Sequence, residues 1–216
     1  MLKILKGQED SIKGLVVCEE TGNASSLPLA LHFLSIASTS NQKVAIVSSK
    51  FTETNYKLIC SKAGIRWNPS QIKFHEFLNA GKFDISANQL MENVYQNVAD
   101  FNPSVVIFDD ISILELFDAT AVEVTVFVHK LYSVLAKNSP ENAILLAPFS
   151  ITSTAKDLLR TRCHIYAQLT PVGHGFGKDA AAKMVLSTKS KSSPITKKGI
   201  LISGERTING SWVSVN

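Results

Sequence analysis

The fold is decided by the stretch Val105-Val106-Ile107-Phe108-Asp109-Asp110, four apolar residues followed by two carboxylates. A short apolar run without polar alternation is typical of a strand that is buried on both faces of a parallel sheet. Acids at the carboxyl end of such a strand can hold Mg²⁺ beside a bound triphosphate. The stretch therefore predicts a nucleotide-binding type of α/β fold, with Asp109 and Asp110 at the ligand edge.

Apolar β-branched segments alternate with helical patterns on both sides of this stretch. Strands are predicted at 15–18, 44–47, 72–77, 143–147 and 163–169, and helices at 27–37, 52–63, 86–101, 121–136 and 154–160. Pro148 is expected to end the strand before it. Beyond Pro171, apolar segments at 184–186, 200–202 and 212–215 predict antiparallel strands. We expect a single α/β domain over residues 1–216, with a mostly parallel sheet flanked by helices.

The segment that should hold the phosphates reads Glu20-Thr21-Gly22-Asn23-Ala24-Ser25-Ser26-Leu27-Pro28. It has one glycine and no lysine, whereas a G-x-x-x-x-G-K-[ST] loop wraps backbone N–H groups around phosphate and neutralises its charge with the lysine. Glu19 and Glu20 would repel a triphosphate, and no nearby lysine offsets them. We expect no cofactor and no ATP hydrolysis by the chain alone.

Asp109 is the better placed of the two acids for a metal, because it directly follows the apolar run. The alternative is a structural role, in which Asp110-Ile111-Ser112 forms an Asx turn or a helix cap. With the phosphate loop missing, we favour the structural role. The five histidines have no metal-ligand spacing, so we expect neither a metal site nor a catalytic constellation.

Composition predicts an intracellular protein. No stretch approaches the roughly 18 apolar residues of a membrane span, and the first residues lack the pattern of a secretory peptide. Cys18, Cys60 and Cys163 lie far apart in apolar segments, which predicts buried reduced thiols.

Positive charge gathers in the last third of the chain. From Lys156 onward there are ten Lys/Arg and three Asp/Glu, an excess of seven positive charges, and since the whole chain carries +4 the first 155 residues carry −3. This asymmetry favours contact with nucleic acid. A solvated basic face is the alternative.

A Ser/Thr-rich segment at 148–156 follows the strand at 143–147, which places it at the carboxyl edge of the sheet. Hydroxyl groups close to cationic side chains suit contacts with sugar and phosphate. The candidates are Ser150, Thr152, Lys156, Arg160 and Arg162. The same pattern fits a surface helix capped by Ser153 or Thr154 equally well.

Together, the Asp-Asp strand, the missing phosphate loop and the hairpin-rich carboxyl-terminal part resemble the RecA-like subunits of the Elongator complex. The segment 105–128, VVIFDDISILELFDATAVEVTVFV, is similar to that family's "hydrophobic-DD-[IL]-S-x-L" strand and the helix after it. Leu31-His32-Phe33-Leu34 and Gly175-Phe176-Gly177-Lys178-Asp179 are also similar to that family. The likeness spans most of the chain.

The resemblance implies a RecA-like (P-loop NTPase-type) fold without an ATP site of its own. It also implies a heterohexameric ring, formed with two sister subunits in two copies each, which binds tRNA and supports modification of the wobble uridine together with the remaining Elongator subunits. Such a protein works in the cytoplasm, with the nucleus as a second compartment. By position, the segment 148–156 would face the central opening of the ring, and Asp109 would be a vestige of a Mg²⁺-binding acid.

Two other classes of function stay open at this stage. A degenerate recombinase-like ATPase acting on DNA would bind DNA in a salt-sensitive way and form filaments. The missing phosphate lysine argues against it, because filament cycling needs nucleotide. An enzyme that uses the sheet edge for unrelated chemistry would need an acid/base constellation, and none is found in the sequence.

Overall fold

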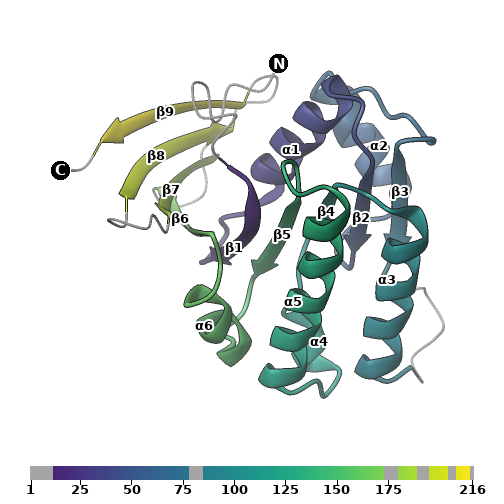
Figure 1. Ribbon diagram of the computed structural model, residues 1–216. Helices are drawn as coiled ribbons and strands as arrows, with labels where there is room; N and C mark the ends of the chain where they lie inside the picture. The colour runs from purple at the N-terminus through teal and green to yellow at the C-terminus, as the bar shows by residue number, and fades with distance from the viewer. Residues whose placement is uncertain (1–11, 78–84, 173–179, 189–194, 204–207, 215–216) are drawn as a thin grey trace.

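The computed structural model describes residues 12–77, 85–172, 180–188, 195–203 and 208–214 (Figure 1). The Gly175–Asp179 turn that contributes to the family resemblance lies outside these residues.

The described strands form one sheet in the order β3-β2-β4-β5-β1-β6-β7-β8-β9. The strands are β1 Gly14–Glu20, β2 Val44–Ser48, β3 Ile72–Glu76, β4 Val105–Phe108, β5 Ile144–Phe149, β6 Ile165–Val172, β7 Ala180–Thr188, β8 Ile195–Ser203 and β9 Ile208–Ser214. The helices are α1 Leu27–Thr39, α2 Glu53–Lys62, α3 Ala87–Phe101, α4 Ile113–Leu116, α5 Ala121–Asn138 and α6 Thr154–Arg160.

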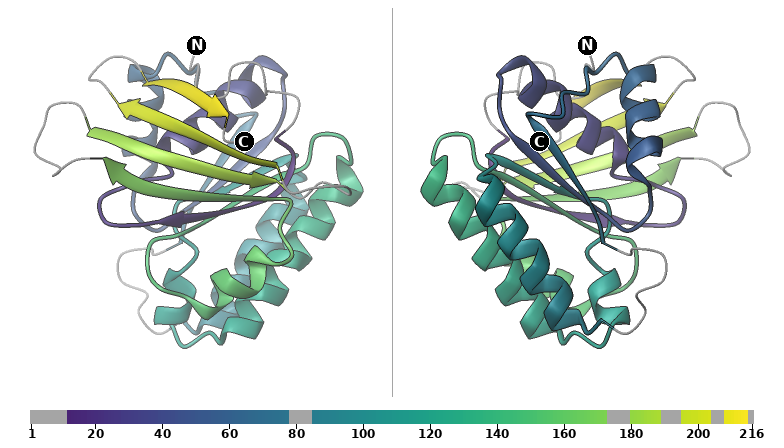
Figure 2. Two further views of the ribbon diagram at one scale, coloured as in Figure 1. Left: turned by 90° about the vertical axis from the view of Figure 1, so that its left-hand side faces the viewer. Right: turned by 90° about the vertical axis from the view of Figure 1, so that its right-hand side faces the viewer.

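The sheet is parallel from β3 across to β6 and antiparallel from β6 to β9. Helices α1 and α2 cover one face of the parallel part, and α3, α4, α5 and α6 cover the other (Figures 1 and 2). The predicted α/β architecture, with a mostly parallel sheet and antiparallel carboxyl-terminal strands, is confirmed.

Each central strand is buried on both faces, which explains its unbroken apolar run. In β4, Val105 and Ile107 pack against the α1/α2 side, whereas Val106 and Phe108 pack against the α3/α5 side. All four residues are at most 1% exposed. Because alternate side chains point to opposite faces, a strand between two helical layers has no solvent-facing position for a polar residue.

Pro148 does not end β5, contrary to the prediction from sequence, because the strand continues through it to Phe149. The Pro148 carbonyl accepts a hydrogen bond from Ile111 N at 2.8 Å, so it points toward the β4 side of the strand. The nitrogen and the carbonyl of one residue in a strand point to the same side, so the ring nitrogen also faces β4. On that side β4 has already ended at Phe108. The missing N–H therefore removes only the rung that would follow the last β4–β5 pair, Ile107 with Leu146.

The single-turn helix α4 was not predicted, since four residues are too few for a helical period to show. The longer helices begin where the sequence indicates. Ser86 and Thr120 form capping boxes with Gln89 and Glu123 at the start of α3 and α5. These reciprocal hydrogen bonds satisfy orphan N–H groups of the first turn.

At the start of β1, Gly14 has φ +99° and lies against the ring of His164, which precedes β6. A Cβ atom on Gly14 would stand 2.6 Å from His164 Cγ. The same imidazole accepts a hydrogen bond from Leu15 N through Nδ1 at 3.1 Å, so the close approach also aligns β1 with β6.

Gly14→Ala is expected to lower the free energy of unfolding by at least about 3 kcal/mol, because it adds a steric clash to an unfavourable φ. Gly64→Ala is the matched control, since Gly64 also has a positive φ (+71°) but has open space at the Cβ position. It should cost only about 1 to 2 kcal/mol of backbone strain. Urea unfolding of both variants measures the difference, and equal losses would contradict the packing argument.

Candidate functional site

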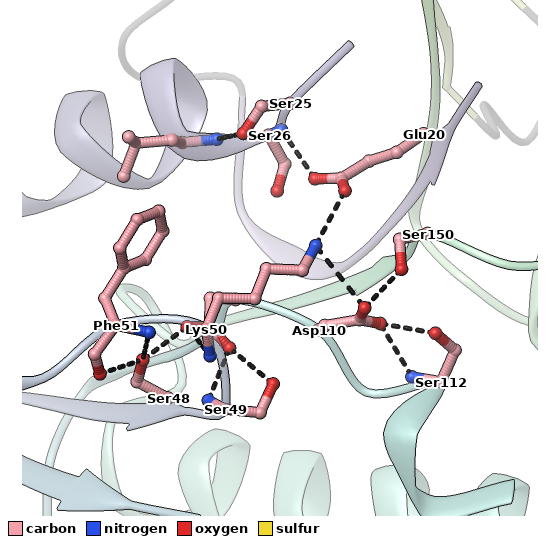
Figure 3. A network of polar contacts seen from close by, with 12 residues as sticks. Glu20, Ser25, Ser26, Ser48, Ser49, Lys50, Phe51, Asp110, Ser112 and Ser150 are labelled. Atoms are coloured by element: carbon pink, nitrogen blue, oxygen red, sulfur yellow. Dashed lines mark hydrogen bonds and ion pairs between the residues drawn. The ribbon is translucent and has the colours of Figure 1, made fainter. Parts of the chain in front are cut away.

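The carboxyl ends of the parallel strands β1, β2 and β4 bring together charged residues that are distant in sequence (Figure 3). The Lys50 ammonium, just beyond β2, lies 3.0 Å from Glu20 Oε2 at the end of β1 and 3.3 Å from Asp110 Oδ2 beyond β4. The side chains of Glu20 and Asp110 are 5% and 9% exposed. Burial by itself lowers the pKa of Lys50, but the two carboxylates outweigh it and raise that pKa. Lys50 therefore stays charged and binds both acids.

Glu20 also occupies the amino-terminal end of α1. Its Oε1 atom accepts a hydrogen bond from Ser26 N at 2.6 Å, and Ser26 is the N-cap residue of that helix (Figure 3). The end of a helix that follows the first strand of this type of sheet is where a phosphate-binding loop holds its anion. In this chain a side-chain carboxylate takes that position.

Asp109, the acid that the sequence places best for a metal, binds the turn after β2. Its carboxylate accepts hydrogen bonds from Ser49 N at 2.8 Å, Ser49 Oγ at 3.1 Å and Lys50 N at 3.0 Å, and a further one from Ser48 Oγ. Asp109 is 6% exposed. Four donors saturate both oxygens, which gives this carboxylate a structural role in fixing the turn that carries Lys50.

Asp110 forms the Asx turn that the sequence offers as the structural alternative. Its Oδ1 atom accepts hydrogen bonds from Ser112 N at 3.0 Å and from Ser112 Oγ. Its Oδ2 atom accepts one from Ser150 Oγ and contacts the Lys50 ammonium. Ser150, a candidate for nucleic-acid contact, thus also belongs to this ion cluster.

A second ion pair lies beside the first. Glu19 contacts the Lys156 ammonium and accepts hydrogen bonds from Tyr166 Oη at 2.6 Å and Gln168 Nε2 at 3.0 Å. Burial by itself raises the pKa of Glu19, but these three donors together lower it to about 2. Lys156 is only 8% exposed. Its ammonium binds Glu19 and is not presented to solvent as a contact for nucleic acid.

The expectation that no lysine offsets Glu19 and Glu20 is wrong. Lys50 pairs with Glu20, 30 residues earlier in the chain, and Lys156 pairs with Glu19, 137 residues earlier. Parallel pairing gathers the carboxyl ends of strands at one edge, so residues that are distant in sequence meet there. The signal that could have found Lys50 is its position directly after the predicted strand at 44–47. With Asp109 and Asp110 included, the edge still carries two more negative than positive charges.

The remaining nucleic-acid candidates are exposed but separated. Thr152 precedes α6, whereas Arg160 ends α6 and Arg162 follows it, about 10 Å further along the helix axis. The Arg160 guanidinium lies over the Tyr166 ring, 4.8 Å from its centroid. Hydroxyl and guanidinium groups therefore stand at opposite ends of α6, and the structure does not bring all five candidates together.

The predicted burial of the thiols is confirmed, since Cys18, Cys60 and Cys163 are all buried. Among the described residues, no group of three or more His, Cys, Asp or Glu side chains could hold a metal ion. No helix in this part of the chain is long and apolar enough to cross a membrane.

Comparison with known proteins identifies the fold. A KaiC-like protein from the hyperthermophilic archaeon Pyrococcus horikoshii superposes with a TM-score of 0.66, covering 92% of this chain and 89% of its own, at 11% sequence identity. The chain thus has the RecA-like, KaiC-like P-loop NTPase fold. No family model and no curated protein matches its sequence.

The contacts of Glu19 should make the free energy of unfolding depend on pH in the acidic range. The pKa of Glu19 is lowered from its ordinary 4.5 to about 2 in the folded chain, so its contribution is complete above pH 4.5 and is lost as the pH falls toward 2. We expect a loss on the order of 2 kcal/mol, after allowance for solvent screening. Glu19→Gln should remove this component.

Urea unfolding at pH 5.5 and pH 2.5 measures the difference between the two proteins. Glu141→Gln, an exposed position between α5 and β5, controls for the loss of a charge elsewhere. An unchanged pH dependence in Glu19→Gln would contradict the argument.

Proposed function

We propose that the chain is a non-catalytic, RecA-like subunit of the Elongator complex that corresponds to Elongator complex protein 6. In this proposal it assembles with two sister subunits into a heterohexameric ring, together with the remaining Elongator subunits. The ring binds tRNA and supports modification of the wobble uridine. The chain contributes surfaces to the ring and does not contribute ATP hydrolysis at its own β1–α1 turn.

The Glu20–Lys50–Asp110 cluster is the observation that supports a non-catalytic role. The carboxylate of Glu20 accepts a hydrogen bond from Ser26 N at the start of α1. Lys50, just beyond the end of β2, neutralises this carboxylate. A triphosphate would have to displace the carboxylate and overcome the excess of negative charge at this edge. Asp109 has its oxygens engaged by the β2–α2 turn, which leaves it poorly suited to orient Mg²⁺.

The resemblance of the Asp-Asp segment at 105–128 supports the Elongator assignment. The RecA-like fold agrees with it, although that fold hosts many functions. The excess of positive charge after residue 156, together with exposed Arg160 and Arg162, supports contact with an anionic polymer.

The isolated chain should neither bind nor hydrolyse Mg·ATP above background, because its own carboxylate occupies the anion position. Titration of a fluorescent ATP analogue and a phosphate-release assay measure both properties. Lys50→Met is the companion variant, since Lys50 is the cation that a nucleotide would recruit at this edge. ATP turnover by the chain that Lys50→Met abolishes would sink the proposal of a non-catalytic subunit.

Within the assembled ring, Arg160→Glu or Arg162→Glu is expected to weaken tRNA binding about three- to tenfold and to reduce its salt dependence, because each variant loses a phosphate contact. Lys137→Glu, at an exposed position in the last turn of α5, is the control for charge reversal. Filter binding at two salt concentrations gives the result. Unchanged affinity in both arginine variants would place the contact elsewhere, in the basic segment 183–198.

Purification of the chain with its native partners tests the assembly directly. The proposal expects two RecA-like sister subunits and tRNA to co-purify. Filaments on DNA without sister subunits would instead favour a recombinase-like protein.

A further inference from the structure

Two adjoining cavities form a groove beside α3 and α5. These helices lie side by side in Figures 1 and 2. One cavity of about 480 Å³ lies between the two helices, with Met91 and Phe127 among its lining residues. A second, of about 470 Å³, lies between the start of α3 and the α4–α5 connection. Asn88 and Glu123 line both cavities, and Asn88 Nδ2 donates a hydrogen bond to Glu123 Oε1 at 3.5 Å where the cavities meet.

Large apolar side chains are exposed in this groove and beside it. Leu116 at the end of α4 is 65% exposed, and Val122 and Val126 on α5 are 64% and 59% exposed. Leu116 lines the second cavity and Val126 lines the first. Val122 and Val126 are four residues apart, so they form one stripe on the outer face of a helix whose opposite face is already buried in the core. An apolar stripe beside a groove marks an interaction surface.

The charges around the groove are mostly negative. Glu92, Asp118 and Glu123 stand on its lining, and Lys130 is the one basic residue among the lining residues. Lys130 lies 3.6 Å from Glu92 and 3.9 Å from the centroid of the Tyr95 ring, so its charge is already compensated. Asp118 and Glu123 remain without a cationic partner among the described residues, which favours an occupant with positive charge.

We propose that the α3–α5 groove binds an amphipathic helix of a partner protein, with an apolar stripe flanked by Lys and Arg. A helix fits because the groove follows the first half of α3, from Ala87 to Tyr95, over about 12 Å or two turns. Apolar residues at i, i+3, i+4 and i+7 of the partner would pack against Leu116 and Val126, which line the groove. Flanking Lys and Arg would face Asp118 and Glu123.

The charges also argue against two other occupants. Nucleic acid would bring phosphates toward Glu92, Asp118 and Glu123. A second copy of this chain, docked about a two-fold axis, would set the same acidic groove against itself. The inference does not depend on the proposed function, because it uses neither the β1–α1 edge nor the basic carboxyl-terminal third.

Two fluorescent helical peptides with the same leucine stripe, one flanked by Lys and the other by Glu, test the proposal by polarisation titration against the full chain. The Lys peptide should bind, and the Glu peptide should bind at least about tenfold more weakly. Val126→Arg should weaken the Lys peptide at least about tenfold. Leu58→Arg should leave its affinity unchanged, since Leu58 is similarly exposed (58%) but lies on α2, across the sheet.

Asp118→Asn isolates the contribution of charge. Asp118 has φ +63°, which asparagine tolerates, so the backbone is kept while the charge is removed. This variant should bind the Lys peptide about two- to threefold more weakly, with a smaller salt dependence. Near-UV circular dichroism confirms that each variant is folded.

Two sets of results would overturn the proposal. The first is failure of the Lys peptide to bind, equal binding of both peptides, or equal losses in Val126→Arg and Leu58→Arg. The second is self-association in sedimentation velocity that Val126→Arg abolishes, because this would assign the groove to a second copy of the chain.

Discussion

The ammonium of Lys50, held between Glu20 and Asp110, ties the ligand edge of this fold together. It connects the ends of β1, β2 and β4, while Glu20 extends the connection to the start of α1 through the Ser26 N–H. Both carboxylates are largely removed from solvent. Removal of Lys50 would leave two largely buried carboxylates without a counter-ion, which is destabilising even though Lys50 itself is 34% exposed. The contacts of this cluster therefore hold the ends of β1, β2 and β4 in their present arrangement.

Under the proposed function, the same interaction separates this chain from the ATP hydrolysis that such a fold can host. A RecA-like sheet directs the carboxyl ends of its strands toward a nucleotide, but here the chain supplies both an anion at the helix end and a cation to neutralise it. Asp109 orders the turn that carries the cation. Two outer surfaces of the chain differ in the sign of their charge. Arg160 and Arg162 are exposed after α6, whereas the α3–α5 groove is acidic.

Local sequence signals predicted the elements well wherever one physical preference dominated. The helix caps at Ser86 and Thr120 and the left-handed residue Asn102 at the end of α3 coincide with the predicted boundaries. Prediction failed where the end of a neighbouring strand lowered the energetic cost of placing a proline inside a strand. Pro148 is tolerated inside β5 because β4 has ended beside it, and this depends on the lengths of two strands that are not adjacent in sequence.

The sequence by itself determined the layers and the loss of the phosphate loop, because apolar runs and missing glycines act locally and leave no alternative. It also placed Asp109 and Asp110 at the end of a buried strand. Only the tertiary structure decided which charges meet. Glu20 pairs with Lys50 because the parallel sheet directs the carboxyl ends of β1 and β2 to the same edge, where the lysine side chain reaches across. Glu19 pairs with Lys156 because helix α6 packs beside β1. Periodicity shows that a strand exists, but its neighbours follow from how the whole chain packs.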